Sequence, residues 1–194
     1  MTDERFARDR FTIKQRIRPM VNLYEVSADG QALAFARQKR MALREDIRVF
    51  ADESEQDELF RIKARAVMDI SARNDVTAAD GTRLGSLTKA FGASLLRSTW
   101  RVLDPDDQEL FAATEKSPTV ALLRRVADFI PFADMVPIPY HFTFVSGGRE
   151  LGGLTRVYGL RDQYELDLSG DPERRVDRRL AIALGIALDA LQAR

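Results

Sequence analysis

The sequence contains no cysteine and only one histidine among its 194 residues. The absence of cysteine excludes disulfides, thiolate nucleophiles and thiolate metal ligands, and a lone histidine excludes histidine-rich metal ligation. The N-terminal residues 1–11 are charged and lack the apolar core of a signal peptide. We therefore expect a cytoplasmic protein with no membrane span, either free or peripheral on the inner face of the membrane.

A charge excess of one sign is also missing, since 30 lysine and arginine residues balance 30 aspartate and glutamate residues. No global field favours nucleic acid, so we expect no nucleic-acid partner. Hydrophobic residues make up 45% and charged residues 31% of the chain, which is typical of soluble globular proteins. Because no low-complexity linker or exact internal repeat divides the chain, residues 1–194 are predicted to form a single domain.

Recognisable catalytic machinery is equally scarce. His141 lies in a predicted strand and is interpreted as a packed histidine. The run 104–107 (DPDD) lacks the spacing, the central glycine and the closing glutamate of an EF-hand loop, so it predicts a turn. Because no nucleophile can be paired with a base, we expect no enzymatic activity, no catalytic residue, no metal site and no cofactor.

What the sequence does contain is an apolar stretch near its C-terminus. Every residue from Leu180 to Leu188 is apolar or glycine, and the pattern has a helical period. A helix that is apolar on all faces must be buried on all faces, and this run is shorter than the about 20 residues that span a bilayer. An aspartate, a proline and a glutamate at 171–173 are typical of a helix start. The sequence therefore predicts a buried helix over about 172–193.

The rest of the chain, over about 11–168, is predicted to form some twelve short strands. Apolar and polar residues alternate in runs separated by Asp-rich or Gly-rich turns, which is typical of antiparallel hairpins. These strands need a place for their apolar faces, and the helix needs a complete apolar coat. A closed sheet around the helix satisfies both, and eight strands would leave no room for a helix about 10 Å wide. We predict a mainly β (α+β) fold, a closed antiparallel barrel of about twelve strands around the C-terminal helix.

The sequence resembles the LURP-one-related (tubby C-terminal-like) family, which shares its fold with the phospholipid scramblases. The stretches that carry the resemblance span nearly the whole chain: FTIKQRI (11–17), LYEVSADGQAL (23–33), DVTAADGTRLGSLTKA (75–90), STWRVLDPDDQEL (98–110) and LAIALGIAL (180–188). The resemblance implies a twelve-stranded barrel around a central C-terminal helix. It also implies a non-catalytic lipid-binding module, since tubby domains bind phosphoinositides.

One segment, about 118–140, departs from the hairpin pattern. It begins with helical spacing and continues as an apolar, proline-interrupted run. It can be interpreted as a lid over one mouth of the barrel or as an amphipathic segment that lies on a membrane. The residues predicted to face a membrane or a partner are Phe129, Ile130, Phe132 and Met135.

Basic residues are concentrated in part of the chain. Residues 61–101 contain eight bases and three acids, and residues 37–48 contain five bases and two acids. These bases either alternate with core residues on a solvated wall or share an exterior patch that attracts anionic lipid. The residues predicted to contact lipid head groups are Lys89, Arg97, Arg124 and Arg125.

Three functions remain open at this point. The first is a non-catalytic module that binds anionic phospholipid head groups or phosphoinositides at a membrane surface. The second is a soluble scaffold or small-ligand-binding protein, in which residues 129–140 would face a protein partner or close a pocket. The third is scramblase-like lipid translocation, which the sequence disfavours because it lacks a cysteine for palmitoylation and a proline-rich N-terminal tail.

Overall fold

The computed structural model describes residues 4–18, 20–39, 46–65, 73–90, 99–116, 141–157 and 163–192. These ranges contain a short 3-10 helix, η1 (Glu4–Phe6), and one α-helix, α2 (Arg178–Gln192). The strands are β1 (Arg10–Arg18), β2 (Val21–Ala28), β3 (Gln31–Lys39), β4 (Asp46–Phe50), β5 (Glu58–Ala64), β6 (Arg73–Ala78), β7 (Arg83–Ala90), β8 (Thr99–Leu103), β9 (Glu109–Glu115), β10 (His141–Ser146), β11 (Arg149–Val157) and β12 (Gln163–Asp167).

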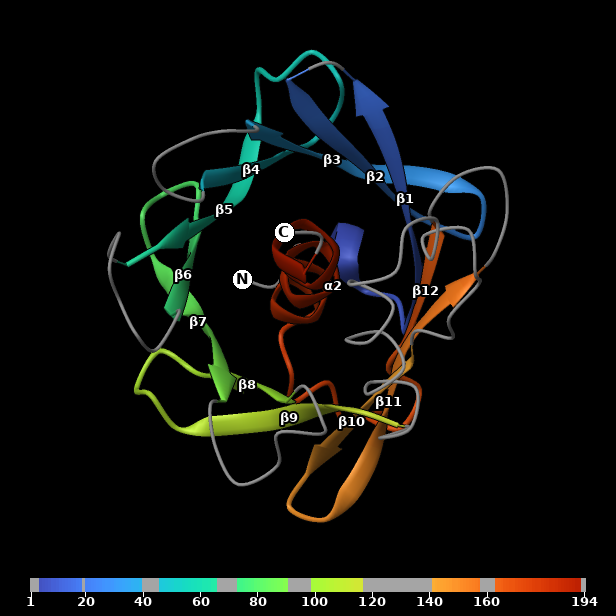
Figure 1. Ribbon diagram of the computed structural model, residues 1–194, viewed down its shortest axis with the longest axis vertical. Coiled ribbons are helices and arrows are strands. Elements are labelled where there is room, and N and C mark those ends of the chain that lie inside the picture. The colour runs from blue at the N-terminus through green and yellow to red at the C-terminus, as the bar shows by residue number, and fades with distance from the viewer. Residues whose placement is uncertain are drawn as a thin grey trace, which may run out of the picture.

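The strands form a closed antiparallel barrel (Figure 1). Each strand pairs with its neighbours in sequence, and β1 also pairs with β12 to close the sheet. Closure leaves no free edge on the sheet formed by the described strands. The predicted mainly β, twelve-stranded closed barrel around a C-terminal helix is confirmed.

Helix α2 occupies the centre of the barrel, because its side chains have no polar face to present to water. Each non-glycine residue from Leu180 to Leu188 is at most 1% exposed. The alanines and the glycine of α2 allow the strands to approach the helix closely. A Cβ built on Gly185 would lie 2.6 Å from Cδ1 of Ile13 in β1. The core therefore consists of one helix and the inward-facing residues of the strands around it.

The predicted start of the helix is wrong by about six residues. The helix begins at Arg178, and Asp177 caps it by accepting a 2.9 Å hydrogen bond from the backbone N–H of Arg179. Asp171 does not cap a helix. It lies buried in the preceding loop and accepts hydrogen bonds from the backbone N–H groups of Arg175 at 3.1 Å and Val176 at 3.0 Å. Asp171, which the sequence predicts to cap the helix, therefore stabilises the loop before the helix instead.

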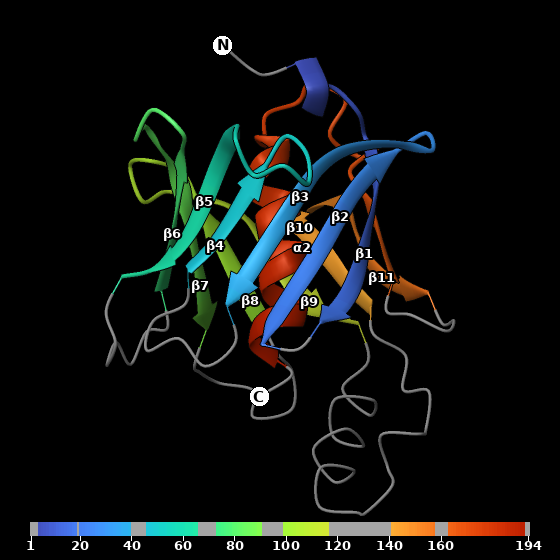
Figure 2. The same cartoon turned by 90° about the horizontal axis from the view of Figure 1, so that it is seen from above.

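The two ends of the barrel differ (Figure 2). The N-terminal segment and the start of α2 lie at one end, and the end of α2 lies at the other. Buried Phe6 of η1 packs edge-on against Phe60, with their ring centroids 6.1 Å apart. The N-terminal segment therefore extends the apolar core at the end where α2 begins.

At the other end, α2 is held by a buried carboxylate. Asp189 accepts a 2.8 Å hydrogen bond from Oη of Tyr24 in β2 and another from Oη of Tyr164 in β12. Burial, and then the charge of Asp189, raises the pKa of Tyr24 above its ordinary value, so its hydroxyl stays protonated and donates. Among the described residues, no helix is long and apolar enough to cross a membrane.

Candidate functional site

Arginines line up across the outer face of the barrel from β1 to β7. In the strand register, Arg16 lies opposite Leu23, Leu23 opposite Arg37, Arg37 opposite Arg48, Arg48 opposite Arg61, Arg61 opposite Thr77, and Thr77 opposite Arg83. We call the set of Arg16, Arg37, Arg48, Arg61 and Arg83 the arginine row. Distant parts of the sequence thus contribute to one line of positive charge.

Strand alternation places these side chains outside. Arg48 lies between Ile47 and Val49, and both of these neighbours are buried in the core. Because successive side chains of a strand point to opposite faces, Arg48 points outward. The same alternation holds for Arg61, whose neighbours in β5 are also buried.

The centre of the row brings three like charges together. Arg37, Arg48 and Arg61 lie directly opposite one another on β3, β4 and β5. Cβ atoms of opposite residues lie only about 5 Å apart, and like charges at such positions are destabilising. This arrangement is unfavourable for folding alone and needs negative charge nearby.

Carboxylates from neighbouring strands and turns supply that charge. Arg37 pairs with Glu55 of the β4–β5 turn (residues 51–57) at 2.7 Å, whereas Arg48 approaches Glu58 only to 3.9 Å. Asp46 pairs with Arg61, and the hydrogen bond from Arg61 holds the pKa of Asp46 below its usual value. Arg48 is therefore the most weakly paired of the three central arginines.

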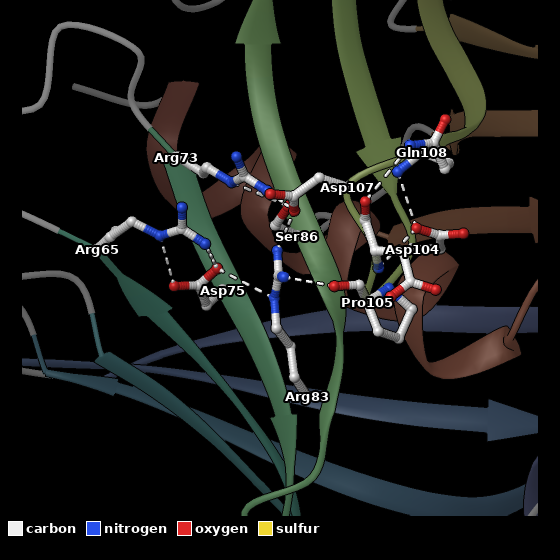
Figure 3. A network of polar contacts seen from close by, with 10 residues as sticks. Arg65, Arg73, Asp75, Arg83, Ser86, Asp104, Pro105, Asp107 and Gln108 are labelled. Carbon is white, nitrogen blue, oxygen red and sulfur yellow. Dashed lines mark hydrogen bonds and ion pairs between the residues drawn. The ribbon is translucent and has the colours of Figure 1, made fainter.

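At the β7 end, the row joins a larger polar network (Figure 3). The guanidinium groups of Arg73 and Arg83 both reach Asp107 of the β8–β9 turn, and Arg65 makes a two-pronged contact with Asp75 at 2.7 and 2.9 Å. Hydrogen bonding by Arg83 holds the pKa of Asp107 below its ordinary value. The network therefore favours the ionised form of Asp107 and pairs each of its arginines with a carboxylate.

The β8–β9 turn itself is the turn that the sequence predicts at 104–107. The carboxylate of Asp104 accepts hydrogen bonds from the backbone N–H groups of Asp106 at 2.9 Å and Gln108 at 2.8 Å. Its acids therefore serve the turn and the arginines. Within the described part of the chain, no group of three or more potential metal ligands comes together.

At the β1 end, the row borders a hollow of about 100 Å³. The outer faces of β1, β2 and β3 form one side, and the β4–β5 turn forms the other. Arg16 and Arg37 line it together with Glu25, Glu53 and Glu55. We call this space the Arg16–Arg37 hollow.

Lys89 is the predicted head-group residue that lies within the described ranges. It is half-buried near the end of β7 and lies opposite Trp100, which is buried in the core. Opposite residues share a face, so Lys89 belongs to the inner face rather than to the outer wall. The remaining predicted site residues lie outside the described residues: Arg97, Arg124, Arg125, Phe129, Ile130, Phe132 and Met135.

A β-bulge explains why Lys89 and Arg83 lie on opposite faces of β7. In β7, Gly85 pairs with Val76, but the next pair joins Arg83 with Thr77, so one residue of β7 is skipped. A bulge of this kind shifts the alternation by one residue. Arg83 and Lys89, six positions apart, consequently lie on opposite faces, which the sequence pattern alone does not reveal.

His141 is packed into the sheet, as predicted. Its Nδ1 lies 2.8 Å from Oγ1 of Thr155, which is its partner across β10 and β11. Burial, and then the charge of Lys116, lowers the pKa of His141 below its ordinary value. The side chain is thus predominantly neutral at pH 7 and contributes to the sheet wall.

Sequence reasoning missed Arg16 and several buried polar side chains. Each of the buried set lies on the inner face of a strand or on α2: Gln15, Gln38, Asn74, Glu115 and Asp189. In the sequence, such a residue stands where the alternating pattern of a strand calls for an apolar one. Gln15, for example, follows Phe11 and Ile13 at the next inward-facing position. A polar layer therefore surrounds part of α2 inside an otherwise apolar barrel.

Comparison with known families agrees with this architecture. The model of the LURP-one-related family matches residues 33–189, which include most of β3, all of β4 to β12 and most of α2. Among curated proteins, the search finds no match to this chain. Because the family match covers well over half of the sequence, the chain belongs to the LURP-one-related family.

Proposed function

We propose that the protein is a non-catalytic binding module that engages anionic phospholipid head groups or phosphoinositides at a membrane surface. The observation that carries this proposal is the juxtaposition of Arg37, Arg48 and Arg61 on the outer wall. Carboxylates of the protein pair closely with Arg37 and Arg61 but only weakly with Arg48, so an external anion can relieve the repulsion that remains. Membership of the LURP-one-related family, on a barrel of this kind, is compatible with such a role.

Arginine is suited to this chemistry. Its planar guanidinium donates two parallel hydrogen bonds to a phosphate and remains charged at every physiological pH. A well-placed basic residue contributes about 1 kcal/mol to binding at an anionic membrane surface. Arg48 is the obvious first contact, because its side chain is 51% exposed and its carboxylate partner is 3.9 Å away.

The site residues predicted from the sequence form a second part of the proposal. Arg97, Arg124 and Arg125 would add head-group contacts, and Lys89 would contribute only at the inner rim. The apolar residues Phe129, Ile130, Phe132 and Met135 would enter the interface between head groups and acyl chains. Their contribution is tested separately from that of the outer wall.

Co-sedimentation with vesicles tests the proposal. We expect binding to vesicles that contain phosphatidylserine or phosphoinositide, little binding to neutral phosphatidylcholine vesicles, and weakening as salt rises. Replacing Arg48→Gln should lower the affinity for anionic vesicles about fivefold. Arg101→Gln is the matched control, since Arg101 is 58% exposed and pairs with Glu109 at 3.3 Å, but lies outside the row.

Equal effects of Arg48→Gln and Arg101→Gln would show that net charge, rather than the arginine row, drives binding. A second arm compares Arg124→Glu combined with Arg125→Glu against the unmodified chain. Loss of binding in that arm alone would move the contact to residues 118–140. Absence of vesicle binding by the unmodified chain would refute the proposal and favour a soluble scaffold or small-ligand-binding protein.

A further inference from the structure

The Arg16–Arg37 hollow combines a defined space with two guanidinium groups. Arg16 comes from β1 and Arg37 from β3, and both lie on the outer wall of the barrel on either side of Leu23. The hollow has a volume of about 100 Å³. Such a space accommodates a small tetrahedral oxyanion but not a large organic ligand.

Both arginines have hydrogen-bonding capacity that the described part of the chain does not use. The Nε atoms of Arg16 and Arg37 are shielded from solvent and have no acceptor within the part of the chain that the structure describes. Buried donors normally have a partner, and each unpaired one calls for an explanation. An incoming ligand with several acceptor oxygens can satisfy these donors.

Two glutamates of the β4–β5 turn accept hydrogen bonds from the Nη atoms of the two guanidinium groups. Glu53 accepts a hydrogen bond from Nη1 of Arg16 at 2.9 Å, and Glu55 accepts one from Nη1 of Arg37 at 2.7 Å. Glu53 and Glu55 are partly exposed, and their turn lies at the surface. Glu25, the remaining acid, belongs to the sheet and also pairs with Arg16.

The charge balance of the hollow depends on the turn. With Glu53 and Glu55 in place, two arginines face three carboxylates. When these two carboxylates move away, the two arginines face Glu25 alone, and the hollow becomes attractive to an anion. Arg48 lies opposite Arg37 and adds positive charge at its margin.

We propose that the Arg16–Arg37 hollow binds a phosphoryl group, and that Glu53 and Glu55 are internal competitors that this group displaces. The inference rests on the proposed function and specifies one subsite for it. A phosphate monoester dianion replaces two separate monoanions and offers acceptors to the whole of each guanidinium group. The phosphoryl group can belong to a lipid head group or to a soluble phosphate, because both present the same chemistry.

Removal of the competitors provides the decisive test. Glu53→Gln combined with Glu55→Gln should raise the affinity about three- to tenfold, given the usual strength of exposed ion pairs. The charge-matched control is Glu109→Gln combined with Glu173→Gln, which changes two exposed, ion-paired glutamates away from the hollow. The double variant Arg16→Gln with Arg37→Gln should lose the affinity, and its melting temperature reports whether it folds.

Two probes distinguish the sources of phosphate. Glycerol phosphate, titrated by phosphorus NMR, reports on the free group, and vesicles of phosphatidylcholine with phosphatidic acid report on the lipid. A gain in affinity in the Glu53/Glu55 double variant beyond that of the control, for either probe, supports the subsite. A gain seen only with vesicles identifies the lipid as the source.

The two proposals fail in different ways. If the unmodified chain binds anionic vesicles but the Glu53/Glu55 variant matches its control, the subsite is refuted and the membrane proposal stands. If vesicles do not bind but glycerol phosphate does, with the expected gain, the subsite stands for a soluble phosphate and the membrane proposal fails. Absence of binding to both probes in every variant refutes both.

Discussion

At the scale of single residues, Gly85 shows how a missing side chain allows two strands and the helix to meet. A Cβ built there would lie 2.1 Å from the carbonyl oxygen of Leu103 and 3.2 Å from the side chain of Leu180 in α2. The backbone φ of +156° is also one that other residues rarely adopt. Gly85 begins the Gly-Ser-Leu stretch that contributes to the family resemblance, and its role there is close packing.

Replacing Gly85→Ala should therefore destabilise the protein strongly. We expect a loss of about 3 kcal/mol in the free energy of unfolding, because the contacting atom is backbone and cannot move aside cheaply. Gly81→Ala is the control, since its φ is +85° but nothing lies within 4 Å of the added Cβ. That change should cost only the conformational penalty of about 1–2 kcal/mol. Urea unfolding measures both, and equal costs would contradict the packing argument.

At the scale of elements, the entry to α2 is fixed by a buried ion pair. Arg178 and Asp171 are both nearly inaccessible, and Nη1 of Arg178 lies 2.7 Å from Oδ2 of Asp171. Burial by itself raises the pKa of Asp171, but hydrogen bonds from Val176 and Arg178 outweigh it and bring the pKa below the ordinary value. The loop and the first turn of α2 are thereby joined as one unit.

This pair makes stability depend on pH in a defined direction. Because the folded pKa of Asp171 lies below the unfolded value of 3.8, its contribution is present above that value and is lost as pH falls through the folded pKa. At pH 7, Asp171→Asn should cost about 3 kcal/mol, since it leaves Arg178 without its buried partner. The difference between the two proteins should shrink below pH 3.8. A difference that stays constant from pH 7 to pH 3 in urea unfolding would contradict this account.

At the scale of the whole molecule, the barrel and its helix depend on each other. The strands close around α2, and each non-glycine side chain from Leu180 to Leu188 is buried against them. Among the residues that the structure describes, neither part has another surface on which to bury its apolar side chains. Folding is therefore expected to be cooperative across the barrel and the helix.

A charge in the helix should consequently prevent folding altogether. Leu184 is completely buried, so Leu184→Asp places an unpaired carboxylate in an apolar core, at a cost that few proteins of this size survive. Soluble yield and circular dichroism measure the outcome. Leu184→Met keeps the volume and should cost less than about 1.5 kcal/mol. A soluble, well-folded aspartate variant would disprove the dependence of the barrel on its helix.

The charge of the molecule is also unevenly distributed. The turns that join β2–β3, β4–β5, β6–β7 and β8–β9 contain no base, but they hold nine acids: Asp29, Asp52, Glu53, Glu55, Asp57, Asp80, Asp104, Asp106 and Asp107. These turns lie at the end of the barrel where α2 begins (Figure 2). An anionic lipid would be repelled by these acids, so lipid binding in the Arg16–Arg37 hollow requires Glu53 and Glu55 of the β4–β5 turn to be displaced.

Much of the fold could be predicted from the sequence because it depends on local patterns. Alternation with a period of two marks strands, and a helix without a polar face can lie only inside another element. The site was less predictable. Arg37, Arg48 and Arg61 were recognisable as outward-facing bases, but nothing local indicated that they lie opposite one another. Alignment of this kind depends on the register between strands, and a shift of one residue would move each side chain to the other face of the sheet.

The sequence by itself determined the number of strands, the order of the hairpins and the burial of residues 180–188, because each follows from hydrophobic periodicity. Only the tertiary structure decided which arginines form a row, which carboxylates neutralise them and where α2 begins. It also placed Lys89 and Arg83 on opposite faces of β7, because of the bulge near Gly85. The physical reason is that strand pairing and ion pairing join residues far apart in the chain, and local propensity carries no information about those distances.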